Sequence, residues 1–157
     1  MATWADLTRG NPAIAKLGRE LLYRTGSGEA LLATVRGDGL PRIHPIAVGI
    51  VSDRVVAFIN DSPKGRDLER DGRYALHTHL DLKVPHELEL RGHARLVTDE
   101  TLRAEAAGGW SFEVDDSYRL FELDIEHALI GERASRNAWP PRYTTWKAST
   151  DADAASR

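Results

Sequence analysis

Three β-like segments follow one another in this chain with only short turns between them, and this spacing restricts the fold more than any other feature. Residues 30–36 are apolar and β-branched, residues 42–51 form a second extended segment, and residues 54–60 are rich in Val, Phe and Ile. The turns are Gly37-Asp38-Gly39 and Ser52-Asp53-Arg54, and glycine tolerates the positive φ angle of a tight hairpin turn. Because a parallel sheet needs a helix after each strand, this spacing predicts antiparallel pairing.

The rest of the chain adds short strands and a few helices. Asn11 before Pro12 indicates a helix start. Pro45 cannot donate a hydrogen bond to a sheet, so it marks an edge strand or a bulge. Asp99 or Thr101 would cap a further helix. We expect a short helix over residues 63–71 and later strands over residues 73–81, 87–98, 143–146 and within 118–130. About six short antiparallel strands predict a small closed barrel.

Length and composition place limits on the function. The 157 residues are enough for one domain with a substantial core, and the net charge of −3 argues against nucleic acid or an anionic membrane as a partner. The chain contains no cysteine, which excludes disulfides and thiol catalysis. No apolar run approaches the roughly 20 residues of a membrane span. We expect a cytoplasmic protein with one domain over residues 1–148 and a disordered tail over residues 149–157.

One short motif is suited to an anionic group. Ser62 can cap a helix that begins at Pro63, and Lys64 and Arg66 add positive charge where the free N–H groups of a helix start are exposed. This combination can bind a phosphate. The alternative is an ordinary Ser-Pro helix start with solvated cations, which is the more frequent arrangement for such a motif taken alone.

Two residues of the second strand extend this possibility. Arg42 and His44 lie two positions apart, so both side chains point to the same face. These side chains can bind an anion, but an arginine on a solvent-exposed strand face is the more common case. A strand interrupted at Pro45 leaves backbone polar groups free, and a flat heterocycle with polar edge atoms can use them.

The histidines and carboxylates do not define a further site. His77 and His79 share a strand face, but no carboxylate or third histidine follows at a recognised metal spacing, so we predict no metal. Asp115 and Asp116 are adjacent and point apart, which does not suit acid–base catalysis. The tryptophans of irregular segments can cover a cofactor or pack over a barrel end, namely Trp110, Trp139 and Trp146.

Several motifs, taken in their order and spacing, resemble the pyridoxamine 5′-phosphate oxidase-like superfamily of flavin-binding split barrels. They cover roughly residues 30–98. The motifs are Ala33-Thr34-Val35, Asp38-Gly39-Leu40-Pro41, Ser62-x-Lys64, Asp71-x-Arg73-Tyr74-Ala75-Leu76 and Glu89-Leu90-Arg91-Gly92-His93-Ala94. The resemblance implies a mainly β fold with flanking helices, built as a six-stranded antiparallel split β-barrel. It also implies a homodimer with two cofactor clefts at the subunit interface.

The resemblance assigns cofactor-binding positions residue by residue. FMN is the implied cofactor, with deazaflavin F420 or haem in some relatives. The family's phosphate motif falls on Ser62 and Lys64, and a glutamine that reaches the flavin ring falls near Glu87. The flavin-contacting strands fall on His44, Pro45, Ile46, Ala47, Phe58 and Ile59.

The chain departs from the oxidase itself at several of these positions. His44 and Gly49 stand where the oxidase has an arginine and a lysine, and Pro63 replaces the arginine of its Ser-Arg-Lys motif. The oxidase's C-terminal substrate motif has no counterpart. Candidate replacements for the missing phosphate cations are Arg36, Arg42 and Arg66.

The sequence therefore leaves three functional interpretations. The first is a flavin- or deazaflavin-dependent oxidoreductase with a small-molecule substrate of unknown identity. The second is a non-catalytic barrel that binds flavin, F420 or haem, and the third is a barrel that has lost its cofactor. No catalytic residue is predicted.

Overall fold

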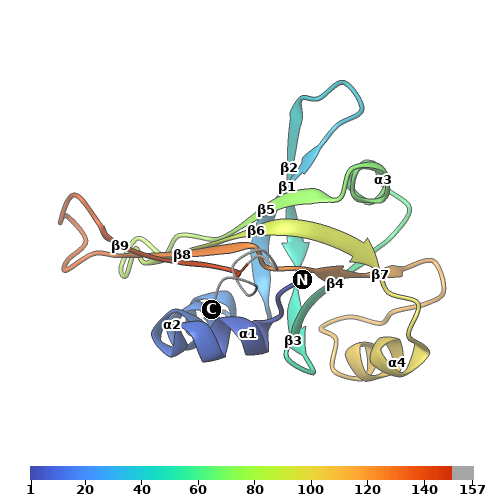
Figure 1. The fold of residues 1–157 in the computed structure, drawn as a ribbon, viewed down its shortest axis with the longest axis horizontal. Coiled ribbons are helices and arrows are strands. Elements are labelled where there is room, and N and C mark those ends of the chain that lie inside the picture. Colours follow the sequence, from blue (N-terminus) through green and yellow to red (C-terminus); the bar gives the residue numbers. More distant parts are fainter. Residues whose placement is uncertain (150–157) are drawn as a thin grey trace.

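The computed structural model describes residues 1–149, and it contains four α-helices and nine β-strands in that range (Figure 1). The helices are α1 (Trp4–Gly10), α2 (Pro12–Leu22), α3 (Pro63–Arg70) and α4 (Glu100–Gly108). The strands are β1 (Glu29–Val35), β2 (Pro41–Ala47), β3 (Gly49–Val51), β4 (Arg54–Ile59), β5 (Arg73–Thr78), β6 (Glu87–Leu96), β7 (Arg119–Leu123), β8 (His127–Glu132) and β9 (Arg142–Lys147). The expected disordered tail falls almost wholly outside the described residues.

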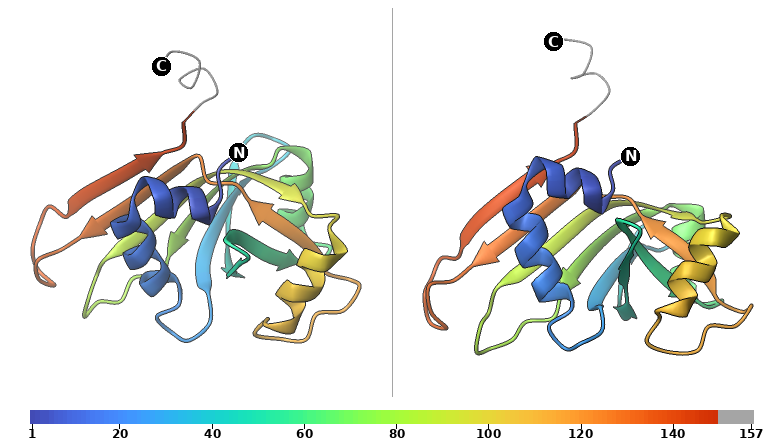
Figure 2. Two further views of the ribbon diagram at one scale, coloured as in Figure 1. Left: turned by 60° about the horizontal axis from the view of Figure 1, so that its bottom comes forward. Right: turned by 90° about the horizontal axis from the view of Figure 1, so that it is seen from below.

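The strands form one antiparallel ladder that curls back on itself. Its order is β2-β1-β5-β6-β7-β4-β3, and its two end strands, β2 and β3, are consecutive in the chain (Figure 2). Only Val48 separates them, and its backbone N–H donates to the carbonyl of Gly28 across 3.0 Å. The single strand predicted over residues 42–51 is therefore two strands with a bend between them. If β2 and β3 are counted as one bent strand, six strands surround the core, as the split barrel requires.

Strand β6 is long enough to pair with two different neighbours, which explains how β8 and β9 are added to the barrel strands. Its residues 87–91 pair with β8, and its residues 94–96 pair with β7. The segment expected to hold one strand within residues 118–130 thus forms both β7 and β8. A Cβ at Gly92 would lie 1.9 Å from the carbonyl oxygen of Asp124, so the β7–β8 connection can cross β6 here only over a glycine.

The core lies on the inward face of the barrel sheet. It is formed by alternate residues of the strands, for example Leu32, Leu76 and Leu90, and α1 and α2 cover it with their apolar sides. Helix α1 was not expected from the sequence. It is short, and its start depends on a capping box between Thr3 and Asp6. In the described residues, no helix is long and apolar enough to cross a membrane.

Among residues 1–149, no helix covers β8 and β9 on the opposite face of the sheet, and α3 contacts β6 on that side, while α1, α2 and α4 lie on the other side (Figure 1). Strand register places alternate residues of β1, β2, β5, β6 and β8 on this outward face. We call it the open sheet face. Its apolar members are Leu31, Ala33, Ile43, Pro45, Ala75 and Leu129, and its charged or titratable members on β6 are Glu87, Glu89, Arg91 and His93.

Candidate functional site

Strand β2 offers a potential ligand its backbone more than its side chains. His44 pairs with buried Leu32, whereas Pro45 pairs with Leu31 on the open sheet face. The side chains of residues 44–47 therefore alternate between two faces of the sheet and cannot all point at one ligand. In the described residues only β1 pairs with β2. The second edge of β2 has backbone groups available for a ligand, although Pro45 itself has no N–H to donate.

The side chains of the two predicted contact residues on β4, Phe58 and Ile59, are buried in hydrophobic clusters. Phe58 packs edge-to-face on Trp110 with their ring centroids 5.0 Å apart, and Ile59 is 1% exposed. A ligand can reach these positions only through the backbone. Strand β3 pairs with residues 54–56 alone, so within residues 1–149 the β3 side of β4 has no strand partner beyond that point.

The start of α3 is built as its sequence predicted. The Ser62 hydroxyl accepts a hydrogen bond from the N–H of Gly65 at 3.4 Å and donates to the carbonyl of Asn60 at 3.1 Å. The Ser62 hydroxyl therefore already donates one hydrogen bond and accepts one in capping the helix. Lys64 is half-buried in the first turn, and it makes no ion pair within 4.0 Å among the described residues. Its ammonium group is thus the unpaired charge at this helix start.

Glu87 lies far from α3 within one protomer. It is the first residue of β6, on the open sheet face, and its Oε2 lies 3.3 Å from Nε2 of His77. The end of β6 near α3 is marked by His93, which pairs with Arg73. Six residues of strand separate Glu87 from His93, which corresponds to about 20 Å. One chain therefore does not bring Glu87 together with Lys64.

Four arginines converge in a pocket of about 400 Å³ between the β1–β2 hairpin and α3. We call it the arginine pocket, and it is lined by Arg36, Gly37, Asp38, Arg42, Pro63, Arg66, Asp67 and Arg70. The three arginines that the sequence suggested as replacement phosphate cations all lie here. Lys64 is not among the lining residues.

A buried aspartate organises this pocket, and sequence reasoning did not identify it. Asp67 is 3% exposed. Its Oδ2 accepts hydrogen bonds from Arg42 Nε at 2.7 Å and from Thr34 Oγ1 at 2.8 Å, and its Oδ1 accepts from Arg70 Nη2 at 3.1 Å. The available signal was the spacing of Asp67 and Arg70, three apart on one helical face.

The hydrogen bonds to Asp67 outweigh the cost of its burial. Burial raises the pKa of the carboxyl, but the hydrogen bonds from Arg42, Thr34 and Arg70 lower it by a larger amount. The net pKa therefore lies below the usual value of an aspartate. Asp67 is therefore ionised at neutral pH and fixes the two guanidinium groups that face it.

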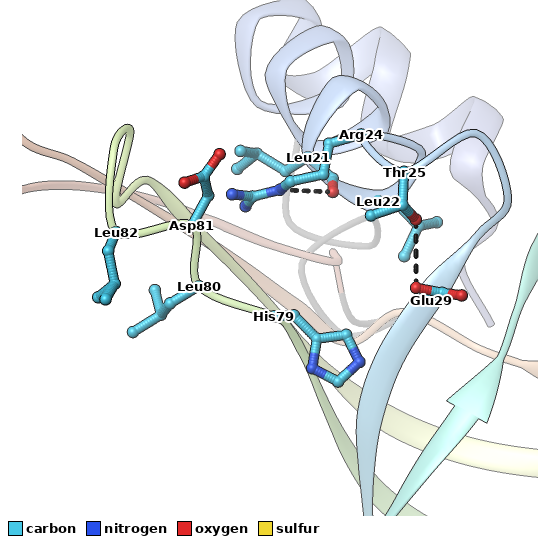
Figure 3. A pocket seen from close by; sticks show the side chains of 9 residues that line it. All are labelled: Leu21, Leu22, Arg24, Thr25, Glu29, His79, Leu80, Asp81 and Leu82. Carbon is cyan, nitrogen blue, oxygen red and sulfur yellow. Dashed lines mark hydrogen bonds between the residues drawn. The ribbon is translucent and has the colours of Figure 1, made fainter.

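A second pocket, of about 290 Å³, lies between the end of α2 and the segment that follows β5 (Figure 3). Leu21, Leu22, Leu80 and Leu82 give it an apolar wall, and His79 stands at its edge. Its volume is at the low end for a ligand pocket, and it contains none of the predicted cofactor contacts.

The histidines do not assemble a metal site within residues 1–149. His77 Nδ1 lies 2.7 Å from the carbonyl oxygen of Thr78, and its Nε2 lies 3.3 Å from Oε2 of Glu87, while His79 lines the pocket of Figure 3. In this range no three metal-ligating side chains converge. That the protein binds no metal remains a prediction, which elemental analysis of the purified protein would test.

The fold and the sequence together define the class of protein. The curled antiparallel ladder with flanking helices is a split barrel, and residues 23–130 match the sequence model of the pyridoxamine 5′-phosphate oxidase family. This match covers most of the chain, so the chain belongs to that family. It includes every predicted cofactor-binding position. The comparison with curated proteins found no match.

Solved structures from several bacteria share the fold. A haem-binding protein from Mycobacterium smegmatis is 16% identical with a TM-score of 0.57, and the aligned region is 80% of this chain but only 55% of that protein. General Stress Protein 26 from Bacillus anthracis is 18% identical with a TM-score of 0.57, covering 80% of this chain and 96% of that one. The haem storage protein HutZ of Vibrio cholerae is 19% identical with a TM-score of 0.56, covering 74% and 90%.

Proposed function

We propose that this chain is a cytoplasmic, homodimeric oxidoreductase that uses FMN or the deazaflavin F420 on a small-molecule substrate. The family match over residues 23–130 carries the proposal, because that segment includes β2, the end of β4 and the start of α3. In such enzymes the bound cofactor supplies the hydride chemistry, and the protein supplies orientation, charge and shielding.

The residues present are compatible with a phosphate-bearing cofactor. Lys64 offers an unpaired ammonium group at the start of α3, and the N–H groups of that helix turn add to it. The free backbone edge of β2, from His44 to Ala47, and the backbone at Phe58 and Ile59 are suited to the polar edge of a flat ring. In this proposal Ser62 positions the helix start that meets the phosphate.

A second copy of the chain would complete the site. The open sheet face carries exposed Ile43 and other apolar side chains, and a stable dimer of this kind buries about 2,000 Å² or more. Glu87 lies on that face, about 20 Å along β6 from the end near α3. It would therefore reach a cofactor held by the second protomer, not one held by its own.

Non-catalytic binding of flavin, F420 or haem is the second candidate. The observation in its favour is that two structures of the same fold are a haem-binding and a haem storage protein. Haem needs an axial ligand such as histidine, and His79 is exposed beside an apolar wall. The pocket there is about 290 Å³, small for a macrocycle, so we favour the flavin and deazaflavin interpretation.

Cofactor titration followed by turnover tests the proposal. Purified protein would be titrated with FMN, F420 and haem, with riboflavin as the control that lacks a phosphate. We expect FMN or F420 to bind, riboflavin to bind more weakly than FMN, and the reduced cofactor to be reoxidised catalytically by an added electron acceptor. Tight cofactor binding without any turnover would favour the carrier interpretation. No binding of any cofactor would favour a barrel that has lost its ligand.

A further inference from the structure

We propose that the arginine pocket is a phosphate-binding site in its own right, distinct from the charge that Lys64 presents. The ligand would be the phosphate group of a small molecule, or inorganic phosphate. The pocket lies between the β1–β2 hairpin and the side of α3 formed by Pro63, Arg66 and Arg70, and Lys64 does not line it. The inference does not depend on the proposed oxidoreductase activity.

Two of the guanidinium groups are held in place before any ligand arrives. Asp67 binds Arg42 at 2.7 Å and Arg70 at 3.1 Å, and Arg70 Nη2 also donates to the carbonyl of Val35 at 2.5 Å. These contacts tie both arginines to α3 and to the end of β1. A ligand that meets fixed donors loses less conformational entropy on binding than one that must order mobile side chains.

The pocket has both spare donors and excess positive charge. A guanidinium has five N–H donors, and Arg42 uses only its Nε for Asp67 while its side chain remains 27% exposed. The lining contains four arginines but only two carboxylates, Asp38 and Asp67. Asp61, outside the lining, also pairs with Arg66, so the excess is one positive charge beside a space of about 400 Å³.

The surplus of positive charge and of N–H donors favours phosphate over a simple carboxylate. The planar fork of arginine matches both groups, but a carboxylate carries one negative charge, whereas a phosphate monoester carries about 1.5 to 2 at neutral pH. A phosphate also presents three acceptor oxygens against the two of a carboxylate, so it can accept from more of the four guanidinium groups. Arg36 and Arg66, whose present partners Asp38 and Asp61 are exposed, can turn to such a ligand without uncovering a buried carboxylate.

Calorimetric titration of the full chain with inorganic phosphate tests this site. Arg36→Gln and Arg66→Gln are the informative variants, because each removes a pocket charge that is not bonded to Asp67. Arg9→Gln is the matched control, since Arg9 also pairs with an aspartate on the surface but lies on α1. We expect each pocket variant to bind phosphate about tenfold or more weakly than wild type, and the control to bind as wild type does.

Competition with the cofactor identifies the source of the phosphate. If FMN displaces inorganic phosphate and riboflavin does not, the pocket receives the cofactor's own phosphate. If protein saturated with FMN still binds phosphate as before, the pocket receives a separate phosphorylated compound. Both results support the site. Absence of phosphate binding at millimolar concentration, or equal binding by wild type and both pocket variants, would overturn it and would leave the flavin proposal standing if FMN still binds.

Discussion

Arg42 Nε lies 2.7 Å from Oδ2 of Asp67, and this charge-assisted hydrogen bond joins edge strand β2 to helix α3. Strand β2 has only one strand neighbour in the described part of the chain, so α3 supplies a second attachment for it. The same contact fixes one wall of the arginine pocket. If the arginine pocket binds phosphate as proposed, one buried carboxylate supports both the stability of the fold and the binding of that ligand.

Asp67→Asn should destabilise the fold by about 1–3 kcal/mol. The asparagine has one oxygen in place of two, so it cannot accept the hydrogen bonds from Arg42, Thr34 and Arg70 together. The cost stays moderate because Arg42 and Arg70 remain partly exposed and can be rehydrated. Urea denaturation would measure it. Asp61→Asn, at an exposed ion pair with Arg66, is the control and should change stability by less than about 0.5 kcal/mol.

The contribution of Asp67 should depend on pH in a defined direction. Its pKa is lower in the folded protein than the 3.8 of a free aspartate, so the folded state favours the ionised form. This stabilisation is complete above the unfolded pKa and is lost as the pH falls through the folded pKa. The stability difference between wild type and Asp67→Asn should therefore be constant near neutral pH and shrink below about pH 4. A difference that grows on acidification would contradict the assignment.

Much of the fold could be predicted from local patterns. The helix starts at Asn11-Pro12 and Ser62-Pro63 and the cap at Asp99 are all confirmed, because capping depends on residues close in sequence. The bend at Val48 was not predicted, because it requires the carbonyl of Gly28, which is distant in sequence. The division of residues 118–130 into β7 and β8 was also missed, since it follows from the crossing over Gly92.

The candidate site was less accessible from sequence than the fold. Residue types alone suggested Lys64 and the three arginines, but they could not show that Arg36, Arg42 and Arg66 line one pocket without Lys64. They also gave no reason to regard Asp67 as buried, since an Asp in a charged helix is usually solvated. Its role became visible only when β1 and β2 were placed beside α3.

Association through the open sheet face should be sensitive to a single charge. Ile43 is 63% exposed and lies on that face, so Ile43→Asp would place a carboxylate in the proposed interface and should give a monomer at micromolar concentration. Light scattering coupled to size exclusion would measure the mass. Leu96→Asp is the control, because Leu96 is 44% exposed but belongs to the inward-facing set of β6. A wild-type monomer would count against the whole interface model.

Lys64→Ala should weaken the binding of FMN or F420 without affecting the fold. A charge-assisted contact to a phosphate contributes about 1.5–3 kcal/mol, which corresponds to a loss of affinity of roughly 10- to 150-fold. Lys64 makes no ion pair in the described part of the chain, so its removal leaves no buried carboxylate unpaired and should change stability by less than about 0.5 kcal/mol. Fluorescence titration would measure affinity, with Lys16→Ala on the exposed side of α2 as the control. If Lys64→Ala binds cofactor as wild type does while Arg36→Gln and Arg66→Gln do not, the arginine pocket alone holds the cofactor phosphate.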